Sequence, residues 1–253
     1  MKLIIDDKKN QLVNKSVTIH ATLDDMRFYG DGERVFSKGS NLHGNLGYAT
    51  GFDVFSWNYR QIERLTGEGV IKIVPSRYRT LFLTRDGRVF VTREQPYHDP
   101  VIEQLCLVGE YGETPEFAEI FGNSSQSLLL DMRGNLYSCV GMGFDRNFKR
   151  VNLPKPIVDY SFGSDHIDVI DVEGNHWAWG SNAFGQLNFM NVRHKRDVPE
   201  PHHTGINSND GTEIECVGAL TTVTTPDGNR VQYGIEVPPL PQKKRARRFL
   251  LIG

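Results

Sequence analysis

Cysteine is scarce in this chain of 253 residues. The three cysteines, Cys106, Cys139 and Cys216, lie far apart and form no CxxC pair. Disulfide frameworks need several cysteines at regular spacing, and structural zinc sites need them in close pairs. The sequence therefore argues against a disulfide scaffold and a zinc cage, and it fits a reducing compartment.

Long hydrophobic runs are also missing. No stretch reaches the ~18 apolar residues that a membrane-spanning helix needs. The first ten residues, MKLIIDDKKN, place acidic residues directly after an apolar stretch that is too short for the core of a signal peptide. We expect a nuclear or cytoplasmic protein that is not secreted and has no membrane partner.

The short motifs that carry catalysis are absent as well. There is no nucleophile elbow, no HExxH and no GxxxxGK[ST], and GMGFDR, which begins at Gly141, lacks the third glycine of a dinucleotide-binding loop. We therefore expect no enzyme activity, no catalytic residue and no cofactor.

Two polar clusters remain as candidates for chemistry. Asp165, His166 and Asp168 lie close enough in sequence for a carboxylate to orient an imidazole for acid–base work. The pair His202-His203 could bind a metal, but it has no cysteine or carboxylate at ligand spacing. A structural histidine in the first cluster and a surface loop in the second explain them better, so we expect no metal site.

Helical periodicity is weak throughout. With 25 glycines and 12 prolines, few segments of more than about ten residues escape a helix-breaking residue. The best helical candidate is FSWNYRQIERL, Phe55 to Leu65, for which a helix and a non-helical structure are equally supported. The pattern predicts an all-β chain.

One octapeptide occurs twice. GSNLHGNL begins at Gly39 and GSNAFGQL begins at Gly180, and the two agree at five of eight positions. Their separation corresponds to three repeats of about 47 residues, a length typical of propeller blades. We interpret the octapeptide as the loop that leaves one hairpin and leads to the next blade, with Asn41 and Asn182 bonding the backbone and the final leucines filling the space between blades.

Five segments share a second pattern, a strand, a turn glycine and a second strand. β-branched or aromatic residues flank the glycine in each, which is typical of a hairpin whose turn needs a positive φ. The predicted turn glycines are Gly32, Gly87, Gly134, Gly174 and Gly228.

These segments resemble the repeats of the RCC1 (regulator of chromosome condensation) family of β-propellers. The most similar copy, Gly163 to Asn188, keeps the leading glycine, His166, the turn Gly174, a Trp-Gly pair and the octapeptide loop. It has Ile167 where the family has threonine. The resemblance covers Asp31 to Gly234 and implies a propeller in which His166 bonds a neighbouring blade.

The chain is short for this family, whose propellers have seven blades. Seven blades of the observed period need more than about 320 residues. We therefore expect a single propeller domain over residues 1–253 with five to six blades, or an incomplete ring, closed by strands from LIIDDKKNQLV and the C-terminal RRFLLIG.

A basic segment, PQKKRARR, stands near the C-terminus. Removing its five positive charges would take the formal net charge from −2 to −7, so it is a separate feature of an acidic chain. It could serve as a nuclear import signal, contact nucleic acid or an acidic partner, or be a solvated run that protects a strand edge. The basic tail comprises Lys243, Lys244, Arg245, Arg247 and Arg248.

The loops between the first and second strands of the repeats depart most from the family pattern, and a radial repeat brings such loops to one face. Residues released from the repeat motif are available for a partner. We predict a partner-binding site formed by Arg77, Tyr78, Arg79, Asn123, Ser124, Ser125, Gln126, Asp165 and His166.

Two functions are compatible with this sequence. The first is a non-catalytic scaffold that mediates protein–protein interactions within a larger assembly. The second, implied by the resemblance, is a guanine-nucleotide exchange factor for a small GTPase. The repeat histidine survives only once and the inserted β-wedge of such exchange factors is not recognisable, so the sequence favours the scaffold.

Overall fold

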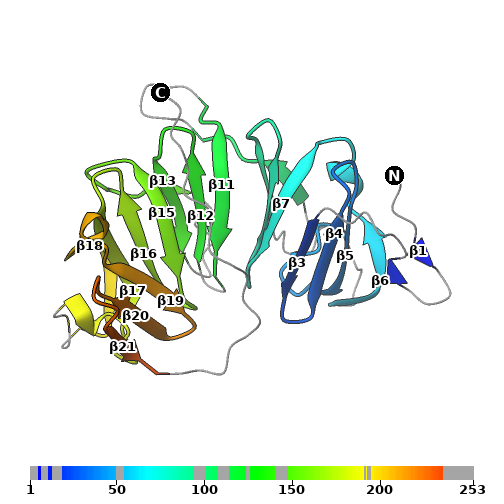
Figure 1. Ribbon diagram of the computed structural model, residues 1–253. Coiled ribbons are helices and arrows are strands. Elements are labelled where there is room, and N and C mark those ends of the chain that lie inside the picture. The colour runs from blue at the N-terminus through cyan, green and yellow to red at the C-terminus, as the bar shows by residue number, and fades with distance from the viewer. Residues whose placement is uncertain are drawn as a thin grey trace. The chain divides into compact units, whose positions relative to one another are not determined.

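The structure is a computed structural model (Figure 1), and it describes residues 5–6, 11–12, 19–49, 54–93, 101–107, 114–123, 126–140, 148–190, 192 and 195–235. The basic tail 243–248 and the predicted C-terminal strand RRFLLIG lie outside the described residues. The proposed closure of the ring by that strand therefore stays a prediction.

The first three sheets each contain four strands that pair in chain order. All pairings that the structure gives within them are antiparallel. The strands are β3 (Ile19–Leu23), β4 (Met26–Gly30), β5 (Val35–Ser40) and β6 (Phe55–Gln61); β7 (Val70–Pro75), β8 (Thr80–Thr84), β9 (Val89–Arg93) and β10 (Val101–Gln104); β11 (Phe117–Gly122), β12 (Gln126–Asp131), β13 (Leu136–Val140) and β14 (Lys149–Arg150).

Two further sheets follow, with four strands and three strands, and a short pair precedes all of these. Their strands are β15 (Ile157–Phe162), β16 (His166–Asp171), β17 (Asn175–Ser181) and β18 (Asp197–Asn207); β19 (Glu213–Val217), β20 (Leu220–Thr224) and β21 (Arg230–Gly234); and β1 (Ile5–Asp6) with β2 (Gln11–Leu12). The only helical elements in the described residues are the 3-10 turns Glu63–Leu65, Asn188–Met190 and Ser208–Asp210. The all-β prediction is confirmed.

The predicted hairpin turns are also confirmed. Each of the five turn glycines lies between the second and third strands of its sheet, with φ between +76° and +88°. An L-residue with a side chain pays a steric cost there, whereas glycine does not. The repeat pattern read from the sequence therefore marks the central hairpin of every described sheet of three or more strands.

The two octapeptide loops have the same hydrogen-bonded geometry. The Asn41 Oδ1 accepts from the Leu46 amide at 2.9 Å, and the Asn182 Oδ1 accepts from the Leu187 amide at 2.8 Å. Both leucines are completely buried. Leu46 packs in a core shared by the first and second sheets, so the scaffold role predicted for this loop is confirmed.

The structure decides one open alternative and corrects one local prediction. The helical alternative for Phe55 to Leu65 fails because its first seven residues form β6, which pairs with β5, and only Glu63–Leu65 turns helically. Aromatic residues at every second position of FSWNY favour such a strand. His202-His203 lies in β18, not in a surface loop, where it pairs across the sheet with Ala178 and Trp177.

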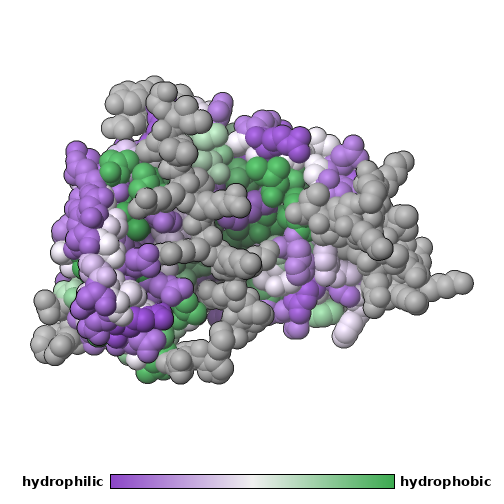
Figure 2. Space-filling model, in the orientation of Figure 1, coloured by the Kyte–Doolittle hydropathy of each residue, from purple (hydrophilic) through white to green (hydrophobic). Residues whose placement is uncertain are grey.

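The chain forms two compact units. One contains residues 1–131 with 139–147, and the other contains residues 132–138 with 148–253. The prediction of one domain over residues 1–253 stays a prediction. In the first unit, hydrophobic residues of the first two sheets make a common core, and on the side shown in Figure 2 hydrophobic residues gather over β7, where Ile71 is 45% exposed.

Candidate partner-binding loops

The predicted partner-binding residues lie in loops of one geometry, each between the first and second strands of a sheet. In the loops 76–79, 123–126 and 163–166, the amide of the first residue donates to the carbonyl of the fourth, at 2.8, 3.0 and 2.9 Å respectively. Ser124 and Ser125 lie outside the described residues. The segments aligned from the sequence are therefore structurally equivalent.

The fourth residue of each loop is buried. Arg79, Gln126 and His166 are 8%, 7% and 0% exposed. By contrast, Arg77 and Asp165 at the loop tips are exposed, and Tyr78 is half-buried. The binding role of all these residues stays a prediction. Among those described, only the residues at the loop tips are accessible to a partner in the folded protein.

His166 bonds a neighbouring sheet, as the resemblance implied. Its Nε2 lies 2.8 Å from the Oγ1 of Thr221 on β20. Burial lowers the pKa of His166 to about 4, because the charged imidazolium loses its hydration inside the protein. The side chain is therefore neutral at pH 7 and acts as a structural bridge.

Asp168 pairs with a histidine that the sequence reasoning missed. Its Oδ2 lies 2.7 Å from the Nδ1 of His176 on β17, and both side chains are buried. Burial raises the pKa of the Asp168 carboxyl to about 6. The predicted grouping of Asp168 with Asp165 and His166 is thus replaced by a cross-strand pair. The pair could have been found from the hairpin turn at Gly174, since the register of that hairpin places residues 168 and 176 on the same side of the sheet.

Arg79 occupies the loop position that His166 occupies in its own sheet, and it also reaches the next sheet. The Arg79 guanidinium contacts the Sγ of Cys139 on β13. Thus the repeat position is structural even where histidine has been lost, and substituting Arg79 should disturb folding as well as any binding.

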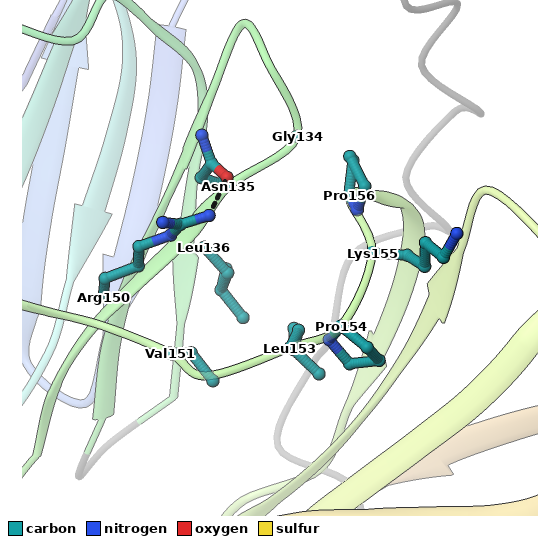
Figure 3. A pocket seen from close by; sticks show the side chains of 9 residues that line it. All are labelled: Gly134, Asn135, Leu136, Arg150, Val151, Leu153, Pro154, Lys155 and Pro156. Carbon is teal, nitrogen blue, oxygen red and sulfur yellow. Dashed lines mark hydrogen bonds between the residues drawn. The ribbon is translucent and has the colours of Figure 1, made fainter. Parts of the chain in front are cut away.

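The described residues of the second unit enclose a small hollow beside the β12–β13 turn. It has a volume of about 90 Å³. Figure 3 shows its lining from the β12–β13 turn and the segment 150–156, with the Arg150 Nη2 donating to the Asn135 Oδ1 at 2.8 Å. Typical small-molecule pockets are ~300–1,000 Å³, so this hollow is too small for a substrate or cofactor.

Metal and membrane signals are both absent from the described part of the chain. Its His, Cys, Asp and Glu residues form no group of three that could hold a metal ion. None of its helices is long and apolar enough to span a membrane.

The chain resembles two curated proteins over parts of their length. It is 24% identical over 222 residues to the human probable E3 ubiquitin-protein ligase HERC6, a match that covers 83% of this chain and 18% of that protein. It is 28% identical over 200 residues to mouse protein RCC2, covering 61% and 37%. The chain therefore spans less than two fifths of either relative. No family model matches it.

Solved structures show the same fold. Human WBSCR16 superposes with a TM-score of 0.66 at 15% identity, over 91% of this chain and 66% of that one. Yeast RCC1 (Prp20), bound to Kap60, superposes with a TM-score of 0.63 at 16% identity, over 85% and 55%. Together with the repeated hairpins and the octapeptide loops, these superpositions show that the chain has a β-propeller fold, with repeats similar to those of RCC1-like proteins.

Proposed function

We propose that this chain is a non-catalytic propeller scaffold that holds a protein partner through the loops between the first and second strands of its sheets. The observation that carries this proposal is that the loops 76–79 and 163–166 each combine a buried structural residue with an exposed tip. The fourth residue is buried, and His166 and Arg79 bond to the next sheet, whereas Arg77 and Asp165 are exposed at the tips. A rigid frame that presents variable tips is typical of a binding protein.

Structural neighbours support a protein partner in general terms. One yeast structure contains Prp20 bound to Kap60, and another describes the binding of Prp20p to Gsp1p and histones. Those partners belong to Prp20. For this chain they support the coarser proposal that it binds a protein partner.

Co-purification from the source cell tests the scaffold proposal. We expect the double variant Arg77→Ala/Tyr78→Ala, and separately Asp165→Ala, to lose a partner that the wild type retains, while the melting temperature stays close to that of the wild type. Arg79 is left intact because it is buried.

A tail variant provides the matched control. It replaces the five basic residues of 243–248 with glutamine and tests the alternative that the tail binds nucleic acid, an acidic partner or the import machinery. If the loop variants fold and keep every partner while the tail variant loses them, the loops are idle and the scaffold proposal fails.

Guanine-nucleotide exchange is the second candidate function. It is favoured by the described binding of Prp20p, a structural neighbour, to Gsp1p. The measurement is the release of fluorescent GDP from a panel of small GTPases mixed with this chain. Under the scaffold proposal, release stays at the spontaneous rate for every GTPase. A catalytic increase for one of them would establish exchange instead.

A further inference from the structure

Two loops from neighbouring sheets meet in the first unit and form one exposed patch. The octapeptide loop contributes Leu42 and His43, and the β7–β8 loop contributes Arg77 and Tyr78; we call these four residues the Leu42–Arg77 patch. Leu42 is 60% exposed, and Arg77 is exposed beside the half-buried Tyr78. The His43 and Tyr78 rings are in edge contact, with centroids 5.2 Å apart.

The patch is held rigidly by buried hydrogen bonds. The Asn45 Nδ2 donates to the Ser76 carbonyl at 2.7 Å and to the Arg77 carbonyl at 3.2 Å. The Thr80 Oγ1 donates back to the Asn45 carbonyl at 2.9 Å. These bonds join the two loops across the sheets, so a partner would not have to order them. Such preorganisation reduces the conformational entropy that binding costs.

The chemistry of the patch indicates its ligand. The described residues provide no carboxylate ion pair for Arg77, whereas Arg34, Arg64 and Arg88 each have at least one. A guanidinium presents parallel N–H donors that match a carboxylate. Leu42, on the octapeptide loop that the Asn45 hydrogen bonds join to the Arg77 loop, offers an exposed apolar side chain. Arginine and tyrosine are also the residues that most often anchor protein interfaces.

Nucleic acid fits this patch less well. Binding to a phosphate backbone needs several cationic side chains, usually with aromatic rings exposed for stacking. Here there is one arginine, Tyr78 is half-buried against His43, and Leu42 is an exposed apolar residue. Charge complementarity therefore favours an acidic protein segment.

The second octapeptide provides an internal comparison. There Phe184 occupies the position of His43 and is 55% exposed. The next loop between first and second strands has Gly218 and Ala219 in place of the charged tip, and its Gly218 carbonyl accepts from the Ser164 amide at 2.7 Å. The second unit thus has an exposed apolar residue without the arginine.

We propose that the Leu42–Arg77 patch binds an exposed acidic segment of a protein partner, with an apolar side chain packed on Leu42 and a neighbouring carboxylate held by Arg77. The inference rests on the proposed scaffold function and names the kind of partner that one of its loops takes. The occupant is an aspartate- or glutamate-containing peptide, and phosphorylation is not required.

Selection of short random peptides displayed on phage against the purified full chain tests this inference. We expect the enriched peptides to carry an aspartate or glutamate next to a large apolar residue. A synthetic copy of an enriched peptide should bind the Arg77→Gln variant roughly tenfold more weakly, the ratio that the loss of one charged anchor of an interface produces. Arg77→Lys should retain part of the affinity, and Leu42→Ala should weaken binding.

Phe184→Ala is the matched control, because it removes an equally exposed apolar residue from the equivalent loop and should leave binding unchanged. Replacing the peptide's acidic residues with their amides should reduce binding to wild type as much as Arg77→Gln does. The inference is overturned if no acidic peptide is enriched, if only phosphopeptides or single-stranded nucleic acid bind, or if Arg77→Gln has no effect. If the co-purification partner then still depends on the loop tips, the scaffold proposal stands without this inference.

Discussion

His166 and Asp168 lie two residues apart on β16, and burial shifts the pKa of each side chain toward its neutral form. The pKa of His166 falls to about 4 and that of Asp168 rises to about 6. Both side chains are therefore costly to charge where they stand, which is the expected consequence of removing them from water. Their effects on the pH dependence of stability have opposite signs.

We predict that His166 and Asp168 change the free energy of unfolding in opposite directions as the pH falls. Unfolded histidine and aspartate titrate near ~6.5 and ~3.9. The stability that neutral His166 provides is present above pH ~6.5 and is lost as the pH falls toward 4. The stability that protonated Asp168 provides is present below pH ~3.9 and is lost as the pH rises through 6. Between pH ~3.9 and pH ~6.5 the contributions of His166 and Asp168 to stability therefore change in opposite directions and partly cancel.

Asp168→Asn removes the titrating carboxyl group, and with it the contribution that opposes His166, but keeps a polar side chain beside His176. We expect the variant's free energy of unfolding to fall more steeply than that of the wild type between pH 7 and pH 5, by ~1–2 kcal/mol, measured by urea titration at each pH. His166→Gln serves as the control and should show the reverse trend. Parallel pH profiles for all three proteins would contradict the assigned shifts.

At the scale of the element, glycine serves two separate purposes. Gly228 needs its positive φ of +83°, but no atom lies close to where a Cβ would be. Gly180 has φ +115° and also leaves no room, since a Cβ would lie 2.4 Å from the Asp165 carbonyl oxygen. The first glycine allows a turn, and the second allows two backbones to approach.

The second prediction separates these roles. Gly228→Ala should lower the free energy of unfolding by about 1–2 kcal/mol, the cost of a side chain in the left-handed region. Gly180→Ala should cost roughly 1–3 kcal/mol more, because the obstructing atoms belong to the backbone and cannot turn aside. Thermal unfolding of both variants measures the difference. Equal melting temperatures would mean that close approach at Gly180 is not required.

At the scale of the whole molecule, neither compact unit is a continuous piece of chain. Residues 132–138 belong to the second unit, whereas 139–147 belong to the first. Unfolding of one unit must therefore alter a segment that leads directly into the other. Two buried cysteines report on the two units, since Cys139 lies in the first and Cys216 in the second, while Cys106 is exposed.

The third prediction uses these thiols. A thiol reagent should modify Cys106 alone in the native protein, because burial shields the other two and raises the pKa of the Cys216 thiol. In increasing denaturant we expect Cys139 and Cys216 to become reactive at the same concentration, as the single-domain prediction requires. Mass spectrometry of the labelled peptides gives both curves. Two separated transitions would show two independent domains.

The sequence by itself determined the repeating hairpin and its loops. Positive-φ glycines and the octapeptide are local requirements of the backbone, so they can be recognised without knowing which strands pack together. The same local pattern correctly aligned the loops that contain Arg77 and Asp165.

Only the tertiary structure decided which members of those loops are accessible. Arg79 and Asp168 look like available polar residues in the sequence, but neighbouring sheets and the opposite strand bury them and provide their partners Cys139 and His176. The tertiary structure likewise joined His43 to Tyr78 and Asn45 to Ser76, because contacts between sheets link residues more than thirty positions apart. Burial and inter-sheet pairing depend on packing, and no local pattern of residues contains that information.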